Sequence, residues 1–296
     1  MVHSITPKAG LLSMIAARLC RVPVRVHTFT GLVFPTASGL KQKILILTDR
    51  ITCACATHII PEGEGVKNDL ISYRITRKPM LVLGYGNVFV INTTHFDPTR
   101  PEVLEAANRI RKHDVFTFIF VGRLVKDKGI NELVAAFKKL NQELPSTRLL
   151  LVGRMESELD PLSPETITEI ENNPAIEAVG SQEDVRPWYA ASDALVFPSY
   201  REGFPNVVIE AGAMGLPSIV TDINGSREII ANGVNGIIIP SQSTSALYEA
   251  MRKFVCEPTC IKAYAEQARP LITSRFEQTF VRSCLKEYYK EIIAHK

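Results

Sequence analysis

Two glutamates, Glu202 and Glu210, stand on either side of the expected start of a helix. Asn206 is a plausible N-cap residue for that helix, although Pro205 could instead lie in its first turn. The first backbone N–H groups of a helix have no partner within the helix, so they form a ready site for an anion. A phosphate group with sugar hydroxyls on both sides would suit this arrangement.

A second cluster of polar residues, from Gly122 to Lys128, follows the apolar run 115–121. Gly122 lets the backbone approach a ligand closely, because it has no side chain. The planar guanidinium of Arg123 suits phosphate oxygens, and Lys128 adds a compact positive charge. Taken alone, these could be two surface cations on a loop. Together with the helix start near Asn206, they favour phosphate binding.

The chain contains no Asp-x-Asp pair. An enzyme that releases a nucleoside diphosphate must neutralise it, either with a metal held by carboxylates or with fixed cations. Because Arg123 and Lys128 supply such cations, we predict that no metal and no cofactor is required.

From residue 115 onward, apolar runs alternate with helical patterns. This alternation predicts a doubly wound parallel sheet with helices on both faces, in which ligands bind at the carboxyl ends of the strands. The motifs above fall at such ends. The expected strands are 115–121, 148–152, 175–179, 194–197, 217–221 and 236–239.

The first part of the chain is less regular. It predicts a smaller α/β domain that begins with a very short strand, so we expect strands to be missing from its N-terminus. The apolar stripe of helix 11–20 is expected to pack in the core, although it could instead dip into a membrane interface with the loop 29–34. Gly84-x-Gly86 is expected to form a turn rather than a dinucleotide site. Expected strands are 24–29, 53–60, 80–83 and 88–91, and expected helices are 11–20, 40–52 and 63–73.

Length and composition are those of a soluble protein with two domains. We place an incomplete first domain at 1–95, a polar linker at 96–114, the second domain at 115–275 and a helix that packs back toward the first domain at 276–296. The six cysteines lack zinc-site spacing, which favours a reducing cytoplasm.

The net charge of +3 is unevenly distributed. Residues 1–95 carry 11 Lys/Arg and 4 Asp/Glu, hence +7, whereas residues 96–296 carry 23 and 27, hence −4. The basic part suits an anionic membrane surface or a phosphorylated substrate, although a solvated basic face explains it equally well. Nucleic acid is disfavoured because no basic and aromatic motif accompanies the charge.

Taken together, these motifs resemble the retaining nucleotide-sugar glycosyltransferases of the two-Rossmann-domain (GT-B) architecture, family four. The resemblance covers nearly the whole chain. Finer motifs, such as Pro7-Lys8-Ala-Gly10, are similar to those of bacterial capsule and lipid-linked-oligosaccharide transferases. The most specific segments are Glu202-x7-Glu210, Gly122-Arg123…Lys128-Gly129 and Thr221-Asp-Ile-Asn-Gly225 with Asn232-Gly-Val-Asn-Gly236.

The resemblance implies a role for each matching residue. Arg123 and Lys128 would hold the donor diphosphate, Glu202 would accept hydrogen bonds from the donor sugar, and Glu210 would hold the ribose hydroxyls. The loop from Gly180 to Asp184 would face the uracil. Backbone groups of the helix start complete the expected donor site at Gly203, Phe204, Pro205, Asn206 and Val207.

The implied reaction is hexosyl transfer from a UDP-sugar to a saccharide on undecaprenyl diphosphate, with retention at the anomeric carbon. Such an enzyme would be cytoplasmic and peripheral on the inner face of the cell membrane. Thr30 stands where family members often have a histidine. His27, three residues earlier, could face the acceptor or could be a packed residue of its strand.

Two other interpretations remain open. The chain could be a non-catalytic remnant that binds nucleotide sugars through an intact donor domain. It could also be a nucleotide-sugar epimerase of the same fold, although the Glu202-x7-Glu210 spacing opposes this. A phosphorylase would need a pyridoxal lysine, for which the sequence offers no context.

Overall fold

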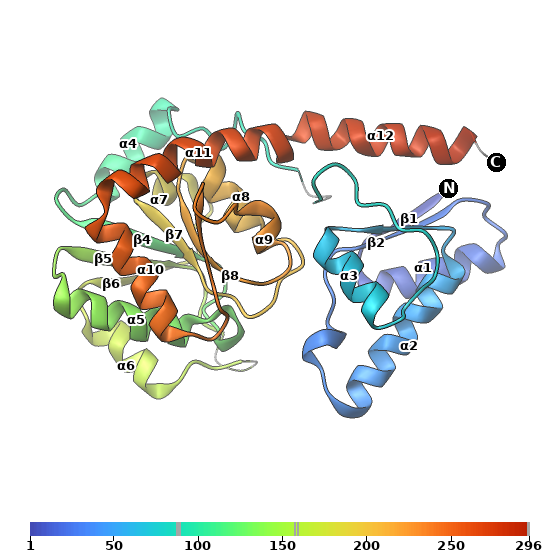
Figure 1. Ribbon diagram of the computed structural model, residues 1–296, viewed down its shortest axis with the longest axis horizontal. Coiled ribbons are helices and arrows are strands. Elements are labelled where there is room, and N and C mark those ends of the chain that lie inside the picture. Colours follow the sequence, from blue (N-terminus) through green and yellow to red (C-terminus); the bar gives the residue numbers. More distant parts are fainter. Residues whose placement is uncertain (87–89, 157, 159, 295–296) are drawn as a thin grey trace. The chain divides into compact units, whose positions relative to one another are not determined.

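The computed structural model describes residues 1–86, 90–156, 158 and 160–294, and the chain forms two compact units (Figure 1). The first unit comprises Met1–Val90, Glu202–Phe204 and Arg275–Lys296, and the second comprises Ile91–Arg201 and Pro205–Ser274. Each unit has its own parallel sheet. The α/β class with two Rossmann-like sheets agrees with the expectation from the sequence.

The second unit is organised around a six-stranded parallel sheet in the order β6-β5-β4-β7-β8-β9. The chain starts in the middle at β4, adds β5 and β6 on one side, and then returns to place β7 on the other side. The point where the strand order reverses therefore lies between β4 and β7, and ligands of open α/β sheets bind at such a point. The strands are β4 (Phe116–Val121), β5 (Thr147–Val152), β6 (Ile176–Gly180), β7 (Ala194–Phe197), β8 (Ser218–Thr221) and β9 (Gly236–Ile239).

Helices cover both faces of this sheet (Figure 1). The buried face of the helix after β4 carries Leu133, Val134, Phe137 and Leu140, the residues that share one face at helical spacing. The helices are α4 (Pro101–Ile110), α5 (Ile130–Glu143), α6 (Pro164–Asn172), α7 (Arg186–Ala190), α8 (Asn206–Ala213), α9 (Ser226–Ile229), α10 (Thr244–Cys256) and α11 (Pro258–Phe276), with a 3-10 turn η2 at Lys126–Lys128.

The first unit contains a three-stranded parallel sheet in the order β1-β2-β3. His58 of β3 makes an edge-to-face ring contact with Tyr288, and the ring of His3 contacts Tyr289 in the same way, so α12 packs on this unit. Its elements are β1 (Val2–Ser4), β2 (Arg25–Phe29), β3 (His58–Pro61), α1 (Pro7–Leu19), η1 (Phe34–Thr36), α2 (Gly39–Cys55), α3 (Glu64–Ser72) and α12 (Gln278–Ala294).

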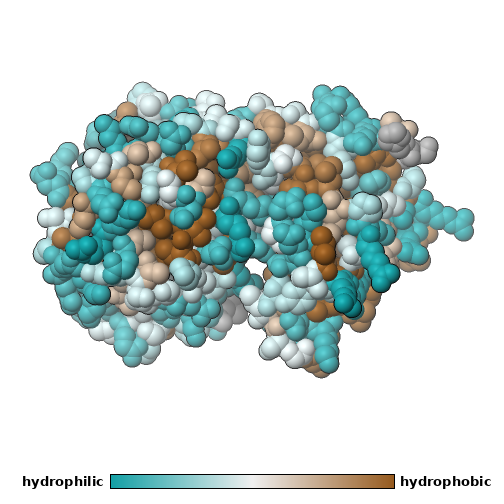
Figure 2. Space-filling view, viewed as in Figure 1, coloured by the Kyte–Doolittle hydropathy of each residue, from teal (hydrophilic) through white to brown (hydrophobic). Residues whose placement is uncertain are grey.

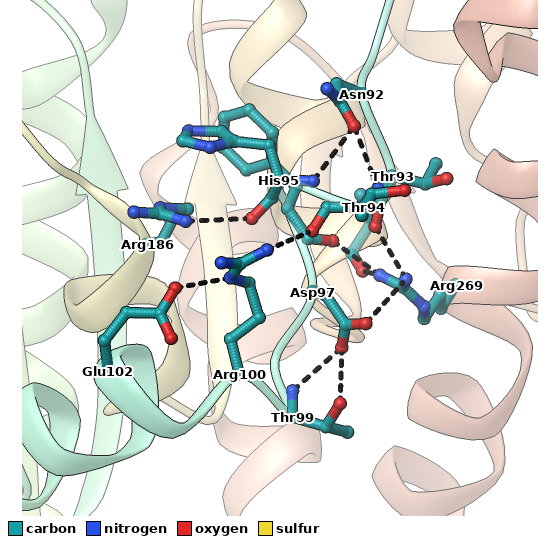
Figure 3. Close-up of polar contacts among 12 residues, drawn as sticks. Asn92, Thr93, Thr94, His95, Asp97, Thr99, Arg100, Glu102, Arg186 and Arg269 are labelled. Carbon is teal, nitrogen blue, oxygen red and sulfur yellow. Dashed lines mark hydrogen bonds and ion pairs between the residues drawn. The ribbon is translucent and has the colours of Figure 1, made fainter.

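The polar segment that was expected to be a linker is fastened within the second unit (Figure 3). Arg269 donates to the carbonyl oxygens of Thr93 at 2.8 Å and Phe96 at 2.6 Å, and its guanidinium lies 3.8 Å from the carboxylate of Asp97. Arg186 donates to the carbonyl oxygen of His95 at 3.1 Å. Two arginines thus bind backbone carbonyl groups of the segment. The segment is therefore anchored to the second unit although its side chains are mostly polar.

Several expected elements differ from the structure. The run 53–60 is not a strand from its start, because Cys53 and Cys55 lie buried in the last turn of α2. Within the described residues, 80–83 forms only an isolated bridge between Met80 and Ile59, and residues 88 and 89 of the expected strand 88–91 lie outside the described residues. The short helix α9 was not expected, and α11 continues through Pro270. Among the described residues, no helix is both long and apolar enough to cross a membrane.

The prediction that the apolar stripe of α1 packs in the core was only partly right. Met14 and Ala17 are the residues that the core buries, whereas Leu12 and Leu19 are 61% and 77% exposed. The helix therefore presents two of its leucines to solvent.

Candidate functional site

A row of glycines ends three neighbouring strands of the second unit. Gly122, Gly153 and Gly180 follow β4 and β5 and end β6, and all three have positive φ angles. The N–H of Gly122 donates to the Val152 carbonyl at 2.9 Å, and the N–H of Gly153 donates to the Gly180 carbonyl at 2.9 Å. A Cβ on Gly153 would lie 1.8 Å from the Gly122 carbonyl oxygen. The ends of β4 and β5 are therefore packed backbone to backbone, which only glycine allows, whereas a Cβ on Gly180 would meet nothing within 4 Å.

Arg123 leaves this edge directly after Gly122. Its guanidinium forms an ion pair with Glu156 at 3.0 Å, and both side chains are accessible to solvent. An exposed pair of this kind contributes little to stability, so a diphosphate could replace the glutamate at low cost. Glu156, to which the sequence analysis gave no role, is thus the group that holds Arg123 here.

Lys128 lies at the end of the turn η2, beside the end of β7. Its Nζ stands 5.7 Å from the ring centroid of Phe197, the last residue of that strand. The next residue, Gly129, has a positive φ angle, and a Cβ there would lie 2.2 Å from the Pro198 carbonyl oxygen. The close backbone packing that only glycine allows therefore brings Lys128 to the reversal point between β4 and β7.

The loops after β4 and β7 are joined through Asp127. Its carbonyl oxygen accepts from the N–H of Tyr200 at 2.8 Å, and its carboxylate pairs with Arg201 at 3.0 Å. The hydroxyl of Tyr200 donates to Glu132 at the start of α5, and this bond together with burial raises the pKa of the Tyr200 hydroxyl. These contacts fix the loop that leads to α8.

Helix α8 starts one residue away from the preferred sequence assignment. Pro205 is its N-cap and Asn206 its first helical residue, so neither Asn206 as the N-cap nor the alternative with Pro205 in the first turn was right. No side chain caps this helix start. Val207 lies in its first turn, at the helix start where the sequence predicts an anion site.

Glu210 lies one turn further along α8 and is mostly buried. Burial raises the pKa of its carboxyl, and the hydroxyl of Tyr189 donates to it at 3.1 Å, which lowers that pKa in part. Tyr189 is fully buried in α7, and its hydroxyl also lies 3.4 Å from the Val207 carbonyl oxygen. Tyr189 was not predicted from the sequence, since its partner lies 21 residues away.

The loop after β6 was expected to face a base. Its Ser181 hydroxyl accepts from Arg154 at 3.2 Å, and its Gln182 amide donates to the Val179 carbonyl at 2.7 Å. At its end, Asp184 pairs with Arg186 at 2.7 Å. The loop is thus shaped by its own polar contacts and begins at Gly180, on the glycine row.

The remaining predicted donor residues, Glu202, Gly203 and Phe204, group with the first unit. Phe204 packs edge-to-face against Phe276, and a Cβ on Gly203 would lie 2.0 Å from the Thr30 carbonyl oxygen. The predicted residues that belong to the second unit, at or next to its glycine-rich sheet edge, are Gly122, Arg123, Lys128, Gly180 and Glu210. Glu202, Gly203 and Phe204 belong instead to the first unit.

His27, the candidate on the acceptor side, is buried in the first unit. Its ring lies under Gly10 and bonds the Ser4 hydroxyl at 2.8 Å, while His3 bonds Thr28 at 2.8 Å and also Tyr289. Burial, followed by the nearby His3, lowers the pKa of His27 to about 4. These observations favour the interpretation of His27 as a packed, neutral residue of its strand.

Within the described ranges, no group of three or more His, Cys, Asp or Glu side chains is arranged to hold a metal ion. The cations of the glycine-rich edge are the only charges that we assign to an anionic ligand.

Comparison with known proteins agrees with this geometry. The family model for glycosyl transferases group 1 matches residues 115–257, which include the whole glycine row and α8. The capsular polysaccharide biosynthesis glycosyltransferase CapM of Staphylococcus aureus is 30% identical over 294 residues, which is 99% of this chain and 77% of that protein. The Escherichia coli UDP-Gal:alpha-D-GlcNAc-diphosphoundecaprenol alpha-1,3-galactosyltransferase is 26% identical over 301 residues, which is 100% of this chain and 76% of that protein.

Solved structures show the same fold. The Anabaena protein Alr3699/HepE in complex with UDP superposes with a TM-score of 0.81 at 19% identity, covering 99% of this chain and 78% of that one. Its complex with UDP-glucose gives a TM-score of 0.81 at 20% identity, covering 97% and 78%.

Proposed function

Because this chain belongs to the glycosyl transferases group 1 family, we propose that it transfers a hexose or an N-acetylhexosamine from a UDP-sugar to a saccharide carried on undecaprenyl diphosphate. The transfer would serve the assembly of a capsule, O-antigen or exopolysaccharide. The names of two relatives support this proposal. CapM is named for capsular polysaccharide biosynthesis, and the Escherichia coli galactosyltransferase for a diphosphoundecaprenol-linked sugar.

The observation that carries the proposal is the bare, cationic edge at the reversal point of the sheet. Gly122, Gly153 and Gly180 put no side chain at the strand ends, and a Cβ on Gly180 would meet nothing within 4 Å. Arg123 and Lys128 belong to the loop that follows β4. The buried carboxylate of Glu210 accepts hydrogen bonds from ribose hydroxyls one turn into α8. Neutral sugars with a diphosphate fit such an edge, since each hydroxyl meets an acceptor and each phosphate a cation.

We further propose that departure of UDP is assisted by these fixed cations rather than by a metal, with retention at the anomeric carbon. Glu202, with backbone N–H groups near Phe204, would position the donor sugar. Positioning and charge stabilisation then lower the barrier without a protein nucleophile. His27 receives no role in this scheme, because its ring is buried and neutral.

The acceptor places the enzyme at a membrane. A saccharide on a lipid diphosphate lies at the cytoplasmic face, and the +7 charge of residues 1–95 supports peripheral attachment there. Localisation is accordingly proposed as cytoplasmic, with reversible contact to the inner face of the cell membrane.

The test is transfer from a panel of radiolabelled UDP-sugars to undecaprenyl-diphosphate-linked N-acetylglucosamine, with and without EDTA. We expect label in the lipid fraction, undiminished by EDTA, and an anomeric configuration that proton NMR shows to be that of the donor. Glu202→Ala should abolish transfer and Lys128→Ala should lower it about a hundredfold, both without unfolding the chain.

Two results would contradict the proposal. Binding of UDP without transfer to any acceptor would favour the non-catalytic alternative. Conversion of one UDP-sugar to another, with no acceptor consumed, would favour the epimerase.

A further inference from the structure

Helix α2 of the first unit carries a row of exposed aliphatic side chains. They recur at intervals of four, three and four residues, which places them on one side of a helix. The exposed fractions are 73% for Leu40, 52% for Ile44, 56% for Leu47 and 37% for Ile51. Thr52, Cys53 and Cys55 of the same helix are buried, so α2 has a core side and a separate apolar side that faces solvent.

Positive charge surrounds this row. Lys41, Lys43 and Arg50 are exposed on the same helix, and residues 1–61 carry seven Lys/Arg and one acidic residue, which is 7 − 1 = +6. The one acidic residue is Asp49, which is half-buried, and burial raises its pKa to about 6. Apolar surface lies beside hydrophilic surface over α2 in the view of Figure 2.

The neighbouring helix extends the same character. Arg18 of α1 donates to the Ala54 carbonyl at 2.9 Å, so the C-terminal ends of α1 and α2 lie together. Leu12 and Leu19 of α1 are exposed, as are Lys8 and Arg18. Two adjacent helices therefore combine exposed aliphatic side chains with cations, and neither helix has an exposed acid.

We infer that the exposed face of α2, formed by Leu40, Ile44, Leu47 and Ile51 with the flanking Lys41, Lys43 and Arg50, docks on an anionic lipid surface. An amphipathic helix with cations beside its apolar row lies in the headgroup region and buries that row at the edge of the acyl chains. A second copy of the chain fits this face poorly, because it would bring two groups of like charges together. This inference rests on the proposed lipid-linked acceptor and adds where and how the enzyme meets its membrane.

The inference differs from attachment by charge alone. Removal of cations weakens binding at low salt only, since salt screens such contacts within a Debye length. Removal of buried apolar groups weakens binding at every salt concentration. The two contributions can therefore be measured separately on the same helix.

The experiment is co-sedimentation of the full chain with vesicles of phosphatidylcholine that contain about one-third phosphatidylglycerol, at low and high salt. Ile44→Gln/Leu47→Gln should lower the partition coefficient about tenfold at both salt concentrations. Lys41→Gln/Lys43→Gln should lower it at low salt and match the wild type at high salt. The matched control is Ile71→Gln/Leu104→Gln, which removes two exposed aliphatic side chains from α3 and α4 and should bind like the wild type.

UDP binding, measured by calorimetry on the same samples, separates this inference from the proposed function. A wild-type chain that binds UDP but not the vesicles overturns the docking face and leaves the donor site standing. A wild-type chain that binds the vesicles but not UDP supports the docking face and overturns the proposed donor site. Row variants that bind vesicles like the wild type would show attachment by charge alone and overturn the inference. It is equally overturned by a dimer in sedimentation velocity that Ile44→Gln/Leu47→Gln dissociates, since the row would then be an interface between copies.

Discussion

The two parallel sheets end very differently at their carboxyl edges. In the second unit, glycines lie at the ends of β4, β5 and β6, and Arg123 and Arg154 directly follow the first two. In the first unit, polar side chains in the last residues of β1 and before Phe29 of β2 bond one another, with Ser4 against His27 and His3 against Thr28. One edge keeps its polar groups accessible to a ligand, and the other uses them in its own packing.

This difference shows why strand topology alone does not identify a site. Both edges have the geometry that commonly binds ligands in α/β proteins. The glycine row has no side chain at the strand ends, and Arg123 and Arg154 directly follow two of its glycines. Burial of His27 and Thr28 instead contributes stability to the first unit through satisfied hydrogen bonds.

The largest expected effect comes from adding a side chain to a glycine of the row. We expect Gly153→Ala to cost about 3 kcal/mol or more of the free energy of unfolding, because its Cβ would meet the Gly122 carbonyl oxygen at 1.8 Å and its φ angle of +148° disfavours a side chain. Urea unfolding measures this cost. Gly215→Ala is the control: its φ is +82° with nothing within 4 Å, so the loss should be about 1 kcal/mol. Equal losses would show that backbone contact at the row is unimportant.

The first unit, whose sheet edge buries His27, should lose stability in acid. The pKa of His27 is lowered to about 4 from 6.5, so below pH 6.5 the unfolded chain binds a proton that the native chain does not. Stability is therefore full above pH 6.5 and is lost as the pH falls toward 4, by on the order of 3 kcal/mol.

Hydrogen exchange, corrected for the intrinsic effect of pH, can compare β2 with β4 in the two units. We expect protection of β2 to decline over this range while that of β4 persists. His27→Gln should remove most of the decline. A decline of equal size in the variant would mean that another group, such as the buried His3, is responsible.

The sequence predicted the second unit well because its signals are local there. An apolar strand followed by glycine and cations marks β4 and its loop, and the same pattern at Val152-Gly153-Arg154 could have added Gly153 to the site. Tyr189 gave no such signal. It is a buried aromatic residue whose function as a donor to Glu210 depends on tertiary structure.

The first unit was predicted less well for the same reason. Cys53 and Cys55 read as part of an apolar strand, yet they lie in α2, because packing against the sheet decides the conformation of a short apolar run. The exposed row of α2 also follows helical spacing, but spacing alone does not tell which side of a helix faces the core. The packing of α1 and α2 settles that question.

Lys128 tests whether the open edge performs chemistry. We expect Lys128→Ala to lower kcat/KM about a hundredfold, since it removes one charge that stabilises the departing diphosphate. Stability should change little. The matched control is Lys126→Ala, an exposed cation in the same turn, which should keep wild-type activity. Transfer assays with the best UDP-sugar decide this, and similar losses in the two variants would point to general electrostatics instead of a defined site.

Tyr189→Phe should cause the smallest loss of the changes considered, and it tests whether Glu210 contacts the nucleotide. It keeps the ring in the core but removes the hydroxyl that bonds Glu210, so UDP affinity should fall about fivefold, or ~1 kcal/mol. Burial already raises the pKa of Glu210, and loss of this hydrogen bond should raise it further. The carboxylate is the acceptor for ribose, so UDP affinity is lost as the pH falls through this pKa, and in the variant that loss should begin at a higher pH.

Calorimetry with UDP across pH measures this shift, and Tyr248→Phe is its control because Tyr248 bonds Glu143 in a similar pair away from the glycine row. A purely structural role for Tyr189 would weaken binding equally at every pH. A displaced pH profile, by contrast, requires that Glu210 touches the nucleotide, which is the property that separates the open edge of the second unit from the closed edge of the first.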